Sequence, residues 1–215
     1  MGSDMLVKPE RVRKKYDRWS RYYDAFDLGG VNDQKRLAVD VLCLSPDSKV
    51  LDVGTGTGAI IPYLAKRLGN GGMAVGVDFS EAMVARANRR IQAAGISERA
   101  IAEVADCTAL PYPDGKFDAG LATFAFTSFP EPEKAIAEIF RVLKPGARFS
   151  VLDTGKPPAG KQRFRYRYLK AVMWRAGYTD ISLDVPALLR NAGFRIIRMQ
   201  RFSGSLAYLC LCEKA

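Results

Sequence analysis

The sequence predicts an α/β fold in which a largely parallel sheet is covered by helices on both faces. Two observations predict it. Short apolar segments rich in β-branched residues alternate with amphipathic segments through the middle of the chain, and this alternation is typical of right-handed βαβ crossovers. A glycine-rich segment, residues 54–58, follows the first of these apolar segments, as it does in the first crossover of many doubly wound sheets.

Each strand or helix is predicted from the residue types within its own segment. Strands are predicted where β-branched and apolar residues cluster, at 49–53, 73–78, 100–104, 117–123 and 148–153. Helices are predicted from apolar spacing, N-caps and glycine or proline stops, at 58–68, 81–94, 131–142 and 184–192, with further helical spacing at 9–26. Segments 194–201 and 205–213 flank a Ser203-Gly204 turn and predict a terminal hairpin.

Length and composition exclude several classes of protein and of catalytic site. A chain of 215 residues, 48% hydrophobic and 26% charged, predicts a single domain, with zones 1–45, 46–153 and 154–215. Its apolar runs are far shorter than the ~18–20 residues of a membrane-spanning helix, and its polar, basic start is unlike a signal peptide, so a cytoplasmic protein is expected. The absence of histidine excludes Ser-His-Asp and Cys-His catalysis and His-ligated zinc.

The four cysteines form no CxxC pair and indicate a reducing compartment. Cys210 and Cys212 are two residues apart, so on a strand both side chains point to the same face. An arsenic or metal site at this pair is one interpretation. The favoured interpretation is two small core residues on a C-terminal strand, and no metal is expected.

The glycine segment is preceded by an acidic residue, and this combination selects between two cofactors. Gly54, Gly56 and Ala59 satisfy a G-x-G-x-x-G/A fingerprint, and Asp78 lies about 20 residues on, which suits NAD. The carboxylate of Asp52, however, would repel a pyrophosphate at the helix N-terminus. It suits S-adenosylmethionine, which carries an ammonium and a sulfonium and has no phosphate.

Two further carboxylates fit the same cofactor. Asp78 ends the second strand, where it can accept hydrogen bonds from ribose hydroxyls. Asp106 follows the third strand, where it can accept from an adenine amino group. Together with Asp52 they lie at the carboxyl ends of three successive strands, and ligands of open α/β sheets bind at that edge.

Four motifs stand in order at close spacing: VLDVGTGTG from 50, GVDFS from 76, LPYPDGKFD from 110 and RVLKPG from 141. As a set they resemble class I S-adenosylmethionine-dependent methyltransferases over roughly residues 40–155. The resemblance implies a Rossmann-like, seven-stranded sheet whose last strand is antiparallel. Within that superfamily, the chain is similar to the ubiquinone/menaquinone C-methyltransferases and the bacterial phosphatidylethanolamine N-methyltransferases.

The resemblance also implies a set of site residues. The segment 16–24 resembles an N-terminal helix that folds over the cofactor, and the segment after the fourth strand would lie beside it. Thr55 departs from the cysteine, alanine or glycine of many relatives. The residues expected to bind S-adenosylmethionine are Tyr16, Tyr22, Asp52, Gly54, Thr55, Gly56, Gly58, Asp78, Phe79, Met83, Asp106, Cys107, Thr123 and Phe124.

No residue is assigned as the catalyst. In-line methyl transfer depends chiefly on alignment, so a strong base is optional when the acceptor is already nucleophilic. Tyr22, Tyr23 and Asp153 are the candidates for assistance. Asp153, at the end of a predicted strand, would equally serve to cap a turn.

The net charge of +10 predicts an anionic partner or a merely solvated surface. Residues 8–21 carry seven basic and two acidic side chains, and residues 156–175 carry seven basic side chains, no acid and several aromatic rings. In related folds both segments flank the substrate entrance. This mixture favours an anionic membrane surface over nucleic acid, although aromatic and basic residues also suit RNA.

The expected function is therefore methylation of a lipid or lipid-soluble acceptor, with a phospholipid headgroup amine or a quinone-like ring as the leading substrates. Two alternatives remain open at this point. One is methylation of a soluble small molecule. The other is a protein that binds S-adenosylmethionine or RNA on the same fold without catalysis.

Overall fold

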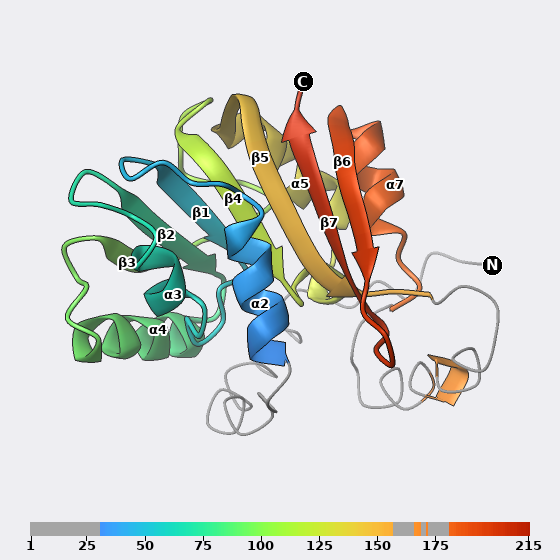
Figure 1. The fold of residues 1–215 in the computed structure, drawn as a ribbon, viewed down its shortest axis with the longest axis horizontal. Helices are drawn as coiled ribbons and strands as arrows, with labels where there is room; N and C mark the ends of the chain where they lie inside the picture. Colours follow the sequence, from blue (N-terminus) through green and yellow to red (C-terminus); the bar gives the residue numbers. More distant parts are fainter. Residues whose placement is uncertain (1–30, 157–165, 169–170, 172–180) are drawn as a thin grey trace.

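The computed structural model describes residues 31–156, 166–168, 171 and 181–215. They contain a seven-stranded sheet in the order β3-β2-β1-β4-β5-β7-β6 (Figure 1). The strands are β1 (Lys49–Val53), β2 (Met73–Asp78), β3 (Ala100–Val104), β4 (Phe117–Thr123), β5 (Leu143–Thr154), β6 (Phe194–Arg201) and β7 (Ala207–Lys214). Only β7 runs antiparallel to its neighbours, β5 and β6. The predicted mostly parallel seven-stranded sheet with an antiparallel last strand is confirmed.

Two strands differ from their predicted bounds. β5 begins at Leu143 instead of residue 148 because Leu143 already pairs with Phe117. A register shift between Phe117 and Ala119 accommodates Pro145 and Gly146, whose φ is +76°. β7 is Ala207–Lys214 rather than 205–213. Ser205 belongs to the turn, since its N–H donates to the Phe202 carbonyl at 3.2 Å and its hydroxyl accepts from Ala207 N.

The helices that lie wholly within the described residues are α2 (Val31–Asp40), α3 (Ile61–Ala65), α4 (Glu81–Ala93), α5 (Pro132–Val142), α7 (Val185–Asn191) and the short 3₁₀ helix η2 (Phe126–Ser128). Ser80 caps α4 as predicted, accepting from Met83 N at 3.2 Å. The helix predicted at 58–68 was too long, because left-handed glycines continue the loop as far as Gly58. The helix predicted at 9–26 lies outside the described residues. Nowhere in the described part of the chain is a helix long and apolar enough to cross a membrane.

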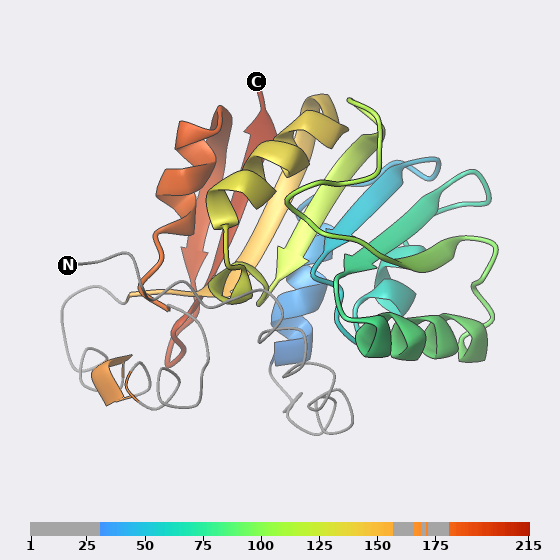
Figure 2. The same cartoon turned by 180° about the vertical axis from the view of Figure 1, so that it is seen from behind.

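The sheet has an apolar core on each face. Residues of α2, α3 and α4 pack on one face of the sheet. In Figure 1, α2 and α3 lie in front of this face. Residues of α5 and α7 pack on the other face, toward the viewer in Figure 2. Alternation along β1 divides its side chains, with Val50 in the first core and Leu51 and Val53 in the second. Cys210 and Cys212 are both fully buried in the second core, as the favoured interpretation predicted.

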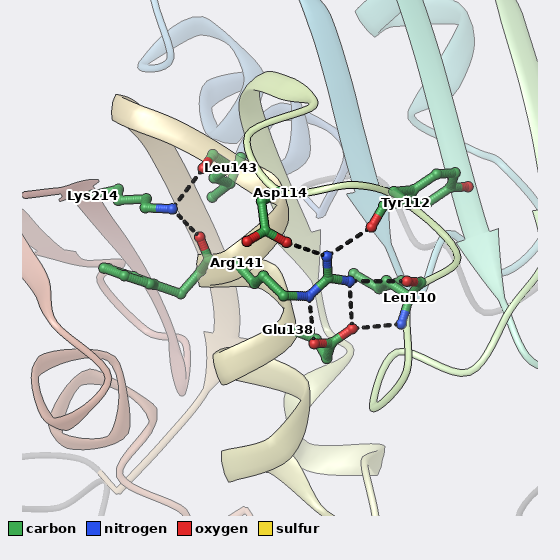
Figure 3. Close-up of polar contacts among 8 residues, drawn as sticks. Leu110, Tyr112, Asp114, Glu138, Arg141, Leu143 and Lys214 are labelled. Carbon is green, nitrogen blue, oxygen red and sulfur yellow. Dashed lines mark hydrogen bonds and ion pairs between the residues drawn. The ribbon is translucent and has the colours of Figure 1, made fainter.

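Arg141 explains why two of the sequence motifs occur together. Its guanidinium donates to both Glu138 carboxylate oxygens at 2.7 and 2.8 Å, to Asp114 at 2.7 Å, and to the carbonyls of Leu110 and Tyr112 at 3.0 and 2.7 Å (Figure 3). Glu138 in turn accepts from Leu110 N at 2.8 Å. The RVLKPG motif therefore fastens the LPYPDG loop to the C-terminal end of α5, where β5 begins.

Candidate cofactor site

The glycine loop between β1 and α3 is held to β2 by three hydrogen bonds from its backbone N–H groups. Gly54 N and Thr55 N both donate to the Val77 carbonyl, at 2.9 and 3.0 Å, and Gly56 N donates to Asp78 Oδ2 at 2.9 Å. Gly54 has a φ of +69°, and a Cβ placed there would lie 2.7 Å from the Ala125 Cβ. The loop thus needs glycine both for its backbone conformation and for its closeness to the segment after β4.

Asp52 lies buried beneath this loop, with only 1% of its surface exposed. Its Oδ2 accepts from the Thr55 hydroxyl at 2.6 Å, which gives a reason for the threonine in the loop. Its Oδ1 has no hydrogen-bond partner among the described residues. Burial raises the pKa of Asp52 to about 6, opposed by the Thr55 hydrogen bond and by the positive charge of Lys35.

The other two predicted carboxylates follow β2 and β3 and are already engaged with the backbone. Asp78 Oδ1 accepts from Ser80 N at 3.0 Å while its Oδ2 holds Gly56. Asp106 Oδ1 accepts from the backbone and the hydroxyl of Thr108, both at 2.8 Å. Each carboxylate oxygen has two lone pairs, so both side chains retain the capacity to accept from a ligand.

One pocket lies beside these groups. The predicted residues that line it are Gly54, Gly56, Asp78, Phe79, Met83, Asp106, Cys107 and Phe124. Asp52, Thr55, Gly58 and Thr123 are not among its lining residues. Gly58 has a structural role instead, because a Cβ there would lie 2.9 Å from the Ala87 Cβ. Tyr16 and Tyr22 lie outside the described residues.

Sequence reasoning missed one wall of this pocket. Ala125, Ser128, Phe129, Pro130 and Glu131 line it next to the glycine loop. They are brought there because β1 pairs with β4, with Leu51 opposite Gly120, although the two strands are far apart in the sequence. No local pattern marks such residues. Lys35 was missed for the same reason, since α2 brings its charge near Asp52 only in the folded protein.

Asp153 holds the missed wall in place. It is fully buried; its carboxylate accepts from Thr127 N at 3.3 Å, from the Thr127 hydroxyl at 3.2 Å and from Thr154 N at 2.7 Å. Burial raises its pKa to about 6, opposed by these hydrogen bonds. Of its two predicted roles, the geometry matches the turn cap. Tyr22 and Tyr23, the other candidates for assistance, lie outside the described residues.

The residues present fit S-adenosylmethionine. The buried Asp52 Oδ1 leaves one acceptor for an ammonium, and a glycine loop with Asp78 beside it leaves room for a nucleoside. The buried carboxylate of Asp52 would repel the pyrophosphate of NAD at this turn. Among the described residues, no group of three or more Cys, Asp or Glu side chains is placed to hold a metal.

Comparisons with known proteins identify the class of domain. A family model described as a methyltransferase domain matches residues 50–146. The demethylmenaquinone methyltransferase of Thermus thermophilus is 41% identical over 163 residues, which cover 75% of this chain and 71% of that protein. The ubiquinone/menaquinone biosynthesis C-methyltransferase UbiE of Geobacter sulfurreducens is 33% identical over 213 residues, covering 89% and 83%.

A solved structure is also similar. The crystal structure of a SAM-dependent methyltransferase from Aquifex aeolicus has a TM-score of 0.68 and 25% identity, covering 97% of this chain and 100% of that one. The fold, the crevice and these comparisons define an S-adenosylmethionine-dependent methyltransferase. More specifically, the chain belongs to the family of demethylmenaquinone and ubiquinone/menaquinone C-methyltransferases.

Proposed function

We propose that this enzyme methylates a ring carbon of a quinone-like, lipid-soluble acceptor. The observation that carries the proposal is that relatives at 41% and 33% identity are named for demethylmenaquinone and for ubiquinone/menaquinone C-methylation. The cofactor pocket is compatible with it, since Phe79, Phe124, Phe129 and Pro130 give this pocket apolar walls. Such walls exclude water from the reacting groups.

Within this proposal, each carboxylate has one partner on the cofactor. Asp52 would bind the ammonium through its unpartnered Oδ1, Asp78 the ribose hydroxyls and Asp106 the adenine amino group. The remaining predicted residues would shape the cradle around them. S-adenosylmethionine, when bound, supplies a methyl group activated by its sulfonium.

The chain's own contribution to the chemistry is alignment. A reduced, hydroquinone-type ring is electron-rich, so its carbon would form the new C–C bond as the methyl–sulfur bond breaks, and the proton of that ring carbon would then pass to solvent. The chain contains no imidazole to take that proton. The apolar walls and the fixed glycine loop hold the acceptor in line, and alignment can supply a large part of the rate.

We also propose that the enzyme associates peripherally with an anionic membrane surface. The net charge of +10 and the lipid-soluble substrates named for the relatives support this. The basic segment 8–21 and most of the segment 156–175 lie outside the described residues. Sedimentation with phosphatidylglycerol vesicles, but not with phosphatidylcholine vesicles, tests the association, and equal sedimentation with both would contradict it.

A methyl-transfer assay tests the substrate class. Labelled S-adenosylmethionine is supplied with a reduced naphthoquinol bearing an unmethylated ring position, with phosphatidylethanolamine vesicles, or with RNA. We expect label in the naphthoquinol, at carbon and not oxygen by mass spectrometry of the product. Label in phosphatidylethanolamine or RNA instead would assign another acceptor. No label in any of them, despite measured cofactor binding, would also contradict the proposal.

A further inference from the structure

Two buried side-chain atoms among the described residues have no hydrogen-bond partner, Asp52 Oδ1 and the hydroxyl of Tyr208. An unmade hydrogen bond costs free energy in a buried site, so each such group calls for an explanation. The cofactor's ammonium accounts for Asp52 in the proposed function. Nothing described so far accounts for Tyr208.

Tyr208 lies at the same edge of the sheet as the cofactor crevice. It pairs in register with Asp153, at the carboxyl end of β5, so the two side chains share one face of the sheet. The end of β5 and the start of β7 lie along the edge at which β1 and β4 also end (Figure 1). Asp153 in turn holds Thr127, between the pocket-lining residues Ala125 and Ser128.

The ring of Tyr208 is fixed in place. It is 2% exposed, and the chain passes so close at Gly155 that a Cβ there would lie 2.8 Å from the ring carbon Cε1. The Arg201 guanidinium lies 5.8 Å from the ring centroid. A ring held this firmly fixes its hydroxyl, which has no hydrogen-bond partner among the described residues.

The surroundings indicate which ligand the hydroxyl suits. The Asp153 carboxylate accepts from Thr127 and Thr154 and not from the Tyr208 hydroxyl, whose proton is left without an acceptor among the described residues. Burial, and then the negative charge of Asp153, raise the pKa of Tyr208, so the hydroxyl stays protonated. The same negative charge, together with that of Asp184, disfavours an anionic ligand here.

We propose that the Tyr208 hydroxyl binds an uncharged ring oxygen of the methyl acceptor, a carbonyl or a hydroxyl, and so orients the ring beyond the η2 wall of the pocket. Tyr208 is then a specificity-determining residue for oxygenated aromatic acceptors. This inference rests on the proposed function, because it supplies the acceptor-side contact of a quinone-like ring.

The test compares two ligands on two proteins. Binding of 1-naphthol and of naphthalene is measured by calorimetry to the protein loaded with S-adenosylhomocysteine. We expect the wild type to prefer 1-naphthol by about tenfold and Tyr208→Phe to lose most of that preference. Tyr208→Phe should keep the wild-type affinity for S-adenosylhomocysteine and a melting temperature no lower than wild type, since no internal hydrogen bond is removed.

Tyr112→Phe is the matched control. Its hydroxyl donates to Glu103 of β3, which is separated from β7 by four strands of the sheet, and neither Tyr112 nor Tyr208 is among the residues that line the pocket. We expect this variant to melt at a lower temperature and to keep the full preference for 1-naphthol. An unchanged preference in Tyr208→Phe, or a melting temperature below wild type in that variant, would overturn the inference.

The two proposals fail in different ways. If the wild type methylates the naphthoquinol but Tyr208→Phe retains its preference for 1-naphthol, the inference alone is wrong. If the wild type neither methylates the naphthoquinol nor prefers 1-naphthol, both are wrong. Preference for 1-naphthol that depends on Tyr208, without methylation of the naphthoquinol, would support the oxygen site and reject the proposed substrate.

Discussion

Replacing Asp52 with Asn should have opposite effects on the stability of the protein and on its affinity for the cofactor. Burial raises the pKa of this carboxyl from 3.8 to about 6, so the folded protein binds its proton more tightly than the unfolded chain does. Stability therefore falls as pH rises from about 4 to about 6, and above that range the ionised form costs about 3 kcal/mol. Asp52→Asn removes this cost.

We accordingly expect Asp52→Asn to unfold at a higher urea concentration than wild type at pH 7.5, by up to about 3 kcal/mol in the free energy of unfolding. The gain should vanish near pH 4, where the wild-type carboxyl is protonated in both states. Urea unfolding followed by far-UV circular dichroism measures it. The Asn oxygen can still accept from the Thr55 hydroxyl, so that contact is retained.

Cofactor affinity should change in the other direction. The ionised carboxylate is the form that binds an ammonium, so wild-type affinity for S-adenosylmethionine should fall about tenfold from pH 7.5 to pH 5, given a pKa of about 6. Asp52→Asn should bind about 10–100-fold more weakly at pH 7.5 and lose this pH dependence. Asp153, whose pKa is also about 6, is present in both proteins, so the comparison isolates Asp52.

Calorimetric titrations at several pH values make the measurement. If the Asp52→Asn variant is less stable than wild type at pH 7.5, the ionised Asp52 carboxylate does not lower the stability of the folded protein. A variant that keeps the wild-type pH dependence of cofactor affinity would refute its assignment to the ammonium.

Three other substitutions test separate parts of the site and fold. Asp78→Ala should weaken S-adenosylmethionine binding about 10–100-fold, and an unchanged dissociation constant by calorimetry would show that the crevice is misassigned. Arg141→Ala should lower the free energy of unfolding by about 2–4 kcal/mol, against about 1 kcal/mol or less for Arg195→Ala, whose ion pair is exposed; equal losses in urea unfolding would contradict the network. Gly54→Ala should lower cofactor affinity at least tenfold by displacing the pocket wall. Gly204→Ala, with the similar φ of +70° in open space, should cost about 1–2 kcal/mol of stability and leave that affinity unchanged; a Gly54 variant that binds like wild type would contradict the steric argument.

The predicted elements that matched best are those fixed by neighbouring residues. β1, β2, β3, β4 and β6 have the predicted bounds, and Ser80 begins α4 as its side chain dictates. The predictions that were wrong depend on more distant partners. The helix expected at 58–68 is only Ile61–Ala65, because left-handed glycines as far as Gly58 continue the loop whose first residues Val77 and Asp78 hold to β2. β5 is longer than expected because Leu143 finds Phe117 on β4.

By itself, the sequence determined the alternation of strands and helices, the glycine loop and the acidic residues that follow three strands. These features depend on side-chain period, capping and backbone freedom over a few residues. It did not determine what each side chain contacts across the sheet. The folded sheet brings Ala125 into contact with Gly54 and Thr127 into contact with Asp153. It also brings Arg141 of the RVLKPG motif into contact with the LPYPDG loop. It also leaves the Tyr208 hydroxyl without a partner, which only the packed sheet reveals, because hydrogen-bond satisfaction in a core depends on residues distant in the sequence.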